Sequence, residues 1–183
     1  MKQTRNTPSI NAGSTADIAF LLLIFFLVTT TFPNDKGIVR KLPVACPEGD
    51  CSVQILDRNL FSILLNNQGA LLVNGEVVSM EKLKEEVTYF ITNNGGGLCG
   101  YCEGLQKELY SVHPTKAVIS IQSGKNSRYK DYIALQNTLS GIYFELREAY
   151  VQRTFQKSFL KLTDAQKKEV VEAYPIKIIE TAL

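Results

Sequence analysis

Residues 12–32 read AGSTADIAFLLLIFFLVTTTF, and this stretch decides the class of the protein. An α-helix rises about 1.5 Å per residue, so a helix of this length can cross a hydrocarbon core of roughly 30 Å. The stretch holds one ionisable side chain, Asp17, and Pro33 follows it where a helix would leave the membrane. The sequence therefore predicts a transmembrane helix over residues 12–32.

A cleaved secretory signal peptide is the alternative interpretation of this stretch, with Lys2 and Arg5 as its charged start. Two features argue against cleavage. No small-residue cleavage site follows the apolar run, and Asp17 stands directly in front of that run. We therefore expect one span that is retained in the protein.

The orientation of the span is predicted from the cysteines, because basic residues flank the span on both sides in nearly equal number. All four cysteines follow the span, as the close pairs Cys46 with Cys51 and Cys99 with Cys102. Paired cysteines in a small domain are typical of an oxidising compartment. We therefore expect residues 1–11 in the bacterial cytoplasm, a periplasmic linker over 33–51 and a periplasmic domain over 52–183.

Asp17 is the candidate functional residue of the span. An ionised carboxylate in hydrocarbon costs at least about 2.5 kcal/mol on insertion scales, and such residues face a protein interior or a water path. Asp17 is therefore a candidate proton-binding site, with Ser14 and Thr15 as candidate polar neighbours on a proton path. The structural alternative is that Asp17 caps the helix at the membrane edge, which leaves a rather short span.

The stretch NAGSTADIAF (residues 11–20), followed by LLLIFFLVTTT, resembles the membrane anchor of the ExbD/TolR biopolymer transport family, and most closely ExbD members from Bacteroidota. The resemblance implies that Asp17 binds and releases protons. It also implies a homodimer inside a pentameric pore of ExbB-like subunits in the inner membrane, whose motion is passed to a TonB-like protein. The proton would be the coupling ion, without another cofactor. Thr15 departs from the pattern, since these relatives usually carry an apolar residue there.

The remainder of the chain alternates between strand-like and helix-like patterns. Strands are predicted at 59–66, 71–73, 76–78, 116–122 and 176–179. Helices are predicted after Ser79 through about Thr92, from Tyr129 onward with an apolar stripe as far as Tyr150, and at about 163–173. Asn74-Gly75 is typical of a type I′ hairpin turn, and Ser79 and Thr163 are expected N-caps. This order predicts a small α/β domain, a two-layer α+β unit with helices on one face of a mixed sheet.

The resemblance extends into this domain through LLVNGE, AVISIQ and YIALQNTLSGIYFELRE, and it implies a similar small α/β unit in the family. The long helix from Tyr129 and the last strand are expected surfaces for the dimer or a partner. A free strand edge there would accept a segment of the TonB-like protein as an added strand.

The cysteine pair Cys99 and Cys102 lies in a predicted insert over residues 94–113. We expect disulfides and no metal site, but the sequence leaves all three pairings of the four cysteines open. A four-cysteine zinc site and a thiol-redox site are the alternatives. The redox hypothesis lacks the strand-to-helix context of a thioredoxin-like motif. His113, alone in a predicted loop, is assigned no chemistry.

The composition of the chain argues against one class of function. The chain has 183 residues, 45% of them hydrophobic, and a net charge of +2, which argues against nucleic-acid binding.

The leading hypothesis, which the resemblance implies, is a non-enzymatic, ExbD-like subunit of a proton-driven motor that energises TonB-dependent transport. The alternatives are a TolR-like subunit of the Tol cell-envelope system and a membrane-anchored periplasmic thiol oxidoreductase that uses Cys99 and Cys102.

Overall fold

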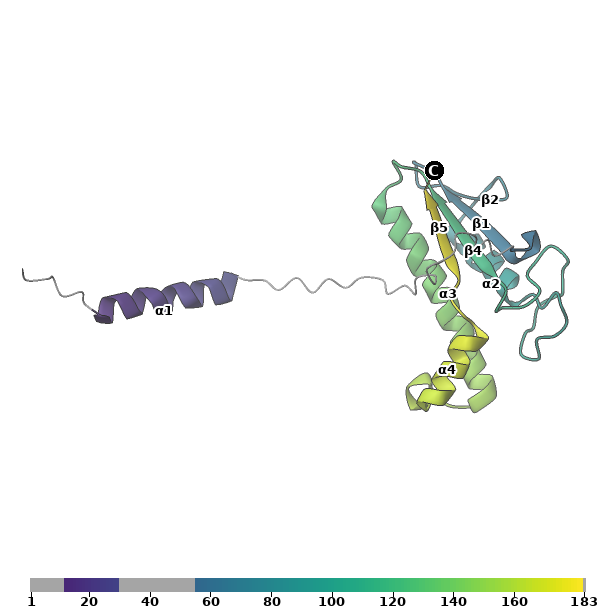
Figure 1. Cartoon of the computed structure of the whole chain (residues 1–183). Coiled ribbons are helices and arrows are strands. Elements are labelled where there is room, and N and C mark those ends of the chain that lie inside the picture. The colour runs from purple at the N-terminus through teal and green to yellow at the C-terminus, as the bar shows by residue number, and fades with distance from the viewer. Residues whose placement is uncertain (1–11, 30–54, 183) are drawn as a thin grey trace, which may run out of the picture. The chain divides into compact units, whose positions relative to one another are not determined.

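The computed structural model describes residues 12–29 and 55–182 (Figure 1). The chain divides into two compact units, Met1–Cys51 and Ser52–Leu183, and each is described by itself. The first contains helix α1 (Ala12–Thr29), which covers most of the predicted span. Residues 30–32 of that span and the whole predicted linker lie outside the described residues.

The second unit is built on a five-stranded sheet with the strand order β3-β2-β1-β4-β5. Its strands are β1 (Leu60–Leu65), β2 (Leu71–Val73), β3 (Glu76–Val78), β4 (Val118–Ser123) and β5 (Ile178–Ala182). The first three form an antiparallel meander, whereas β1, β4 and β5 run parallel, with Ile63 opposite Ile121 and Ile119 opposite Ile178. The prediction of a mixed sheet is therefore confirmed.

The tight turn between β2 and β3 has the conformation that its sequence predicts. Asn74 and Gly75 both have positive φ angles, 52° and 85°. A type I′ turn requires positive φ angles at both of its central residues, and its twist matches that of two antiparallel strands.

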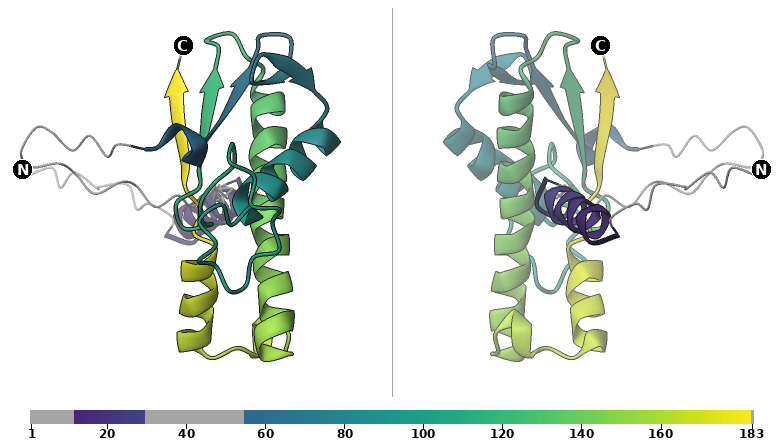
Figure 2. Two further views of the ribbon diagram at one scale, coloured as in Figure 1. Left: turned by 90° about the vertical axis from the view of Figure 1, so that its right-hand side faces the viewer. Right: turned by 90° about the vertical axis from the view of Figure 1, so that its left-hand side faces the viewer.

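Helices α2 (Met80–Thr92) and α3 (Tyr129–Phe155) cover the same face of the sheet (Figure 2). Alternate residues of β1 point to this face, since Phe61, Ile63 and Leu65 are buried while Ser62 is exposed. They share one core with apolar side chains of both helices, among them Leu83, Val87, Leu135, Leu139 and Ile142. The domain is thus a two-layer α+β unit, as predicted.

Helix α3 is a long helix that begins at Tyr129, as predicted. It runs to Phe155 and ends at Gln156, which takes the left-handed conformation with φ 51°. Beyond the sheet, α3 lies beside helix α4 (Asp164–Ala173), so that the two form a helical hairpin (Figure 2). Val151 is fully buried in a second small core in this hairpin, and it was missing from the predicted apolar stripe. Short 3-10 turns at Asp57–Asn59 and Phe159–Lys161 were not predicted either.

Two strands begin later in the chain than predicted, because a turn precedes β4 and because the pairing with β4 determines where β5 begins. β4 begins at Val118 rather than residue 116, because the N–H groups of Lys116 and Ala117 donate to the carbonyl of His113 in a turn. β5 begins at Ile178, where its pairing with Ile119 of β4 starts, and not directly after Pro175.

The two predicted helix N-caps are confirmed. Thr163 caps α4 through a capping box with Gln166, and Ser79 caps α2.

Candidate functional site

Helix α1 has the length and apolarity of a membrane span. Its 18 residues correspond to about 27 Å, close to the thickness of the hydrocarbon core. It is the one helix among the described residues that meets these criteria, and none of its side chains is buried within the structure. Its large apolar surface, from Ile18 to Val28, therefore requires lipid or another protein around it.

Asp17 is the single ionisable side chain of α1. Residues three and four apart share a helix face, so Ser14 and Gly13 lie on the face of Asp17, and Leu21 continues this face one turn further on. Thr15 lies about 200° around the helix from Asp17, and its hydroxyl donates to the carbonyl of Ala12 at 3.1 Å. Of the two predicted polar neighbours, the structure brings only Ser14 to the Asp17 side.

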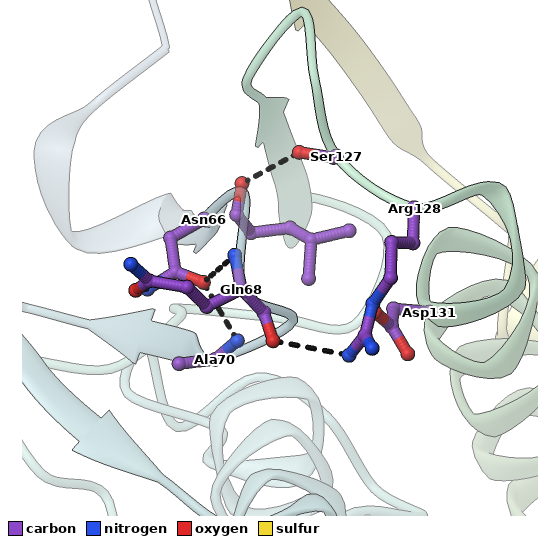
Figure 3. A network of polar contacts seen from close by, with 7 residues as sticks. Asn66, Gln68, Ala70, Ser127, Arg128 and Asp131 are labelled. Atoms are coloured by element: carbon purple, nitrogen blue, oxygen red, sulfur yellow. Dashed lines mark hydrogen bonds and ion pairs between the residues drawn. The ribbon is translucent and has the colours of Figure 1, made fainter.

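The carboxyl ends of the parallel strands β1 and β4 are closed by a polar network (Figure 3). The Asn66 side-chain oxygen accepts hydrogen bonds from the N–H groups of Gln68 and Ala70 at 2.9 and 2.8 Å. Arg128 donates to the carbonyl of Gln68 at 3.0 Å and pairs with Asp131 at 2.7 Å. Ligands of open α/β sheets bind at this edge. Here the polar side chains are hydrogen-bonded to the backbone of the β1–β2 turn or paired with one another, so we assign this edge a structural role.

The predicted insert over residues 94–113 is an ordered loop that two buried asparagines hold in place. The Asn93 side chain donates to the carbonyls of Lys107 and Ser111 at 2.8 and 3.0 Å and accepts from the N–H of Lys107. The Asn94 side chain bonds both the N–H and the carbonyl of Cys99. Buried amides with every group paired fix a loop strongly, because breaking one bond leaves a polar group unsatisfied.

A disulfide joins Cys99 to Cys102, and between them lies Tyr101, whose side chain docks the insert onto α3 and the C-terminal end of α4. The Tyr101 hydroxyl donates to the carbonyl of Ala173 at 2.8 Å. Its ring makes edge contacts with Tyr150 and Tyr174, with centroids 5.1 and 5.4 Å apart. Sequence reasoning assigned no role to Tyr101, which the structure shows partly buried against the core.

The surroundings of this disulfide do not resemble a thiol-redox site. Cys99 is buried, and no helix begins at the pair, because the chain stays irregular from there to β4. Reactive cysteines usually lie in an exposed position at a helix N-terminus or beside a cationic group. The cation beside this pair, Arg153, donates to the carbonyl of Tyr101 at 2.9 Å and is neutralised by Glu103 at 2.8 Å. The other predicted disulfide candidates, Cys46 and Cys51, lie outside the described residues. Among the residues that are described, no group of three or more side chains could hold a metal ion.

His113 is partly buried beside the insert, and its environment predicts a pH-dependent stability. Its Nδ1 accepts a hydrogen bond from the N–H of Thr115 at 3.2 Å. Burial, and then the positive charge of Lys116, lower the pKa of His113 from 6.5. The unfolded chain therefore binds a proton at a higher pH than the folded domain does, so stability falls as the pH drops below about 6.5.

We expect the thermal midpoint of the full chain in detergent to be lower at about pH 5.5 than at about pH 7.5. His113→Gln should flatten this dependence, because His113 is the single histidine of the chain. Midpoints that fall equally with pH in both proteins would show that other groups cause the effect.

Comparison with known proteins gives consistent matches. The family model described as "Biopolymer transport protein ExbD/TolR" matches residues 3–145. Two proteins of Helicobacter pylori, from strains ATCC 700392 / 26695 and J99 / ATCC 700824, are each 28% identical over 88 residues. Both are named "Putative biopolymer transport protein ExbD-like 2". These matches cover 46% of this chain and 63% of each relative, less than two thirds of the relatives' length.

Proposed function

Since the chain belongs to the ExbD/TolR family of biopolymer transport proteins, we propose that it is an ExbD-like subunit of an inner-membrane, proton-driven motor that energises TonB-dependent transport. The observation that carries this proposal is Asp17, the single ionisable side chain of an apolar helix long enough to span a membrane. Intramembrane carboxyl groups mark proton relays in pumps and transporters. The relatives' name, ExbD-like, supports ExbD over TolR as the type of subunit.

The proposed mechanism uses the charge of Asp17 as a switch. A proton that enters from the periplasm neutralises the carboxylate, so that α1 can turn inside an apolar ring of partner helices. Release of the proton to the cytoplasm restores the charge and returns the helix to a polar position, with Ser14 on the same face as the carboxylate. Each charge that crosses 100 mV supplies roughly 2.3 kcal/mol, so a few protons suffice for one mechanical step.

The proposed topology is a single pass with a cytoplasmic N-terminus and a periplasmic folded domain. Two copies would place their α1 helices inside a pentamer of ExbB-like subunits, which covers the apolar surface that α1 leaves exposed. The folded domain would then pass the motion to a TonB-like protein. β5 suits this contact, because it is the last strand of the sheet and its outer edge carries no further strand among the described residues.

The test is removal of this chain from cells. We expect energised uptake of an iron-siderophore complex to fall to the level of cells without a proton gradient, while resistance to detergents is retained. Uptake should return when the chain is expressed again. Intact uptake together with detergent sensitivity and leakage of periplasmic proteins would contradict the proposal and favour a TolR-like subunit of the Tol system.

A further inference from the structure

A pocket of about 300 Å³ lies on the flank of α3. Its walls come from α3, from the 3-10 turn at Phe159–Lys161 and from the segment just before β5. The lining residues are Ser140, Tyr143, Phe144, Arg147, Glu148, Phe159 and Ile176. The pocket thus adjoins the start of the sheet's free edge strand.

The hydroxyl of Tyr143 is an unsatisfied polar group beside this pocket. Tyr143 is 1% exposed, and its hydroxyl has no hydrogen-bond partner among the residues that the structure describes. The backbone N–H of Lys177 and the guanidinium of Arg147 lie near its oxygen and act to lower the pKa of Tyr143, but no group of the described residues accepts the hydroxyl proton. Burial raises the pKa of Tyr143 to about 12, so the group stays neutral and keeps a proton to donate. An orphaned buried hydroxyl is rare and points to a partner that is absent here.

Arg147 is a half-buried charge that no acidic group of the described residues neutralises. Its Nε and Nη2 atoms donate to the carbonyl of Tyr174 at 3.0 and 2.7 Å, and no ion pair joins it to a carboxylate there. Burial lowers the pKa of Arg147, which shows that its charge is partly desolvated. Glu148, also at the pocket, accepts a hydrogen bond from Gln152 instead. A desolvated cation without a counter-charge favours an anionic ligand.

Apart from Ser140, the remaining walls of the pocket are apolar, and they are open to solvent. Phe144 is 66% exposed and Ile176 is 46% exposed, and Phe159 lies partly buried beside them. Exposed aromatic and aliphatic side chains around a few polar groups are typical of a site that binds one side chain of a peptide.

We propose that this pocket binds a carboxylate side chain of an extended segment of a partner protein, with apolar residues of that segment against Phe144, Phe159 and Ile176. Arg147 supplies the counter-charge, and the Tyr143 hydroxyl donates a hydrogen bond to the same carboxylate. Charge complementarity identifies the occupant, since Arg147 is the charged group of the pocket without an opposite charge in the described chain. The inference rests on the proposed function in one respect, because it takes the occupant to be the partner that receives the force.

The test uses the full chain in detergent micelles, with tyrosine rings labelled with ¹³C, and two short peptides. The probe is acetyl-Leu-Glu-Leu-amide, and its uncharged counterpart is acetyl-Leu-Gln-Leu-amide. Saturation transfer from protein to peptide measures affinity, and the ring resonance of Tyr143, assigned by its loss in Tyr143→Phe, reports on the site. We expect the glutamate peptide to shift this resonance and to bind at least about tenfold more tightly than the glutamine peptide.

Two variants and a control make the test specific. Arg147→Gln should abolish the difference between the peptides. Tyr143→Phe should weaken the glutamate peptide about threefold or more without lowering thermal stability, because the removed hydroxyl has no hydrogen bond in the free protein. Arg153→Gln, on the same helix but paired with Glu103 at 2.8 Å, should bind as the wild type does.

Equal affinity for the two peptides, or a preference for glutamate that survives Arg147→Gln, would overturn the inference. So would a Tyr143 resonance that does not move at saturating glutamate peptide. These measurements need no proton gradient, so their failure leaves the motor proposal intact. The motor proposal is tested separately, by siderophore uptake in cells that lack the chain.

Discussion

Asp17→Asn is expected to reduce energised siderophore uptake to the level of cells that lack the chain. Asparagine keeps the size and polarity of the side chain but cannot bind and release a proton, so the proposed switch has no charge to change. Asp17→Glu keeps the carboxyl group one methylene further from the backbone and should retain part of the activity. The measurement is the initial rate of uptake, at equal amounts of each protein in the membrane fraction.

The matched control for this experiment is the double variant Cys99→Ser with Cys102→Ser. It removes the disulfide but leaves Asp17 unchanged, and we expect uptake to continue. The opposite pattern, with uptake retained in Asp17→Asn and lost in the double variant, would contradict the motor proposal and favour a thiol-based function.

Leu139→Ala is expected to destabilise the folded domain by about 2–5 kcal/mol, the usual cost of truncating a fully buried leucine. Leu139 is 0% exposed and lies in the core that α3 shares with the sheet. Neighbouring side chains cannot move in to fill the space that the leucine side chain leaves, because protein interiors are close-packed. Denaturant unfolding of the full chain in micelles, followed by circular dichroism, measures this loss.

Leu160→Ala is the matched control, because Leu160 is 89% exposed in the turn between α3 and α4. The same chemical change there should alter the free energy of unfolding by less than about 0.5 kcal/mol. A similar cost for the two variants would show that α3 does not pack on the sheet as described.

The elements with strong local signals could be predicted from the sequence. The apolar run with Asp17 indicated a membrane-spanning helix, and Asn74-Gly75, Ser79 and Thr163 indicated a turn and two helix starts that the structure confirms. These signals succeed because they depend on φ angles, helix period and capping within a few residues.

The features that the sequence did not indicate depend on contacts between distant residues. α3 extends to Phe155 because Val151 packs against α4, a helix that follows later in the chain. Gln136 is fully buried in the first third of α3, where its side chain donates to Glu180 of β5 at 2.8 Å. A local sequence pattern does not indicate either contact, because the two residues that meet in each contact are far apart in the sequence.

The candidate sites also differ in how far the sequence alone indicates them. Asp17 stands out in the sequence as a candidate because a carboxylate in an apolar run is unusual, and its role as a proton-binding site stays a prediction. Helical spacing places Ser14 on the face of Asp17 and Thr15 away from it. The pocket at Tyr143 and Arg147 was not recognisable, because both residues fall within an ordinary amphipathic pattern. Only the fold shows that the hydroxyl is orphaned and that the guanidinium lacks an acidic partner in the described chain.

Proton movement through the purified membrane complex tests the central claim most directly. The complex that co-purifies with this chain is reconstituted into vesicles that contain a pH-sensitive dye, and a potassium diffusion potential drives protons inward. We predict acidification of the vesicle lumen with the wild type and none above the protein-free level with Asp17→Asn. Equal acidification by the two proteins would contradict the assignment of Asp17 as the proton-binding site.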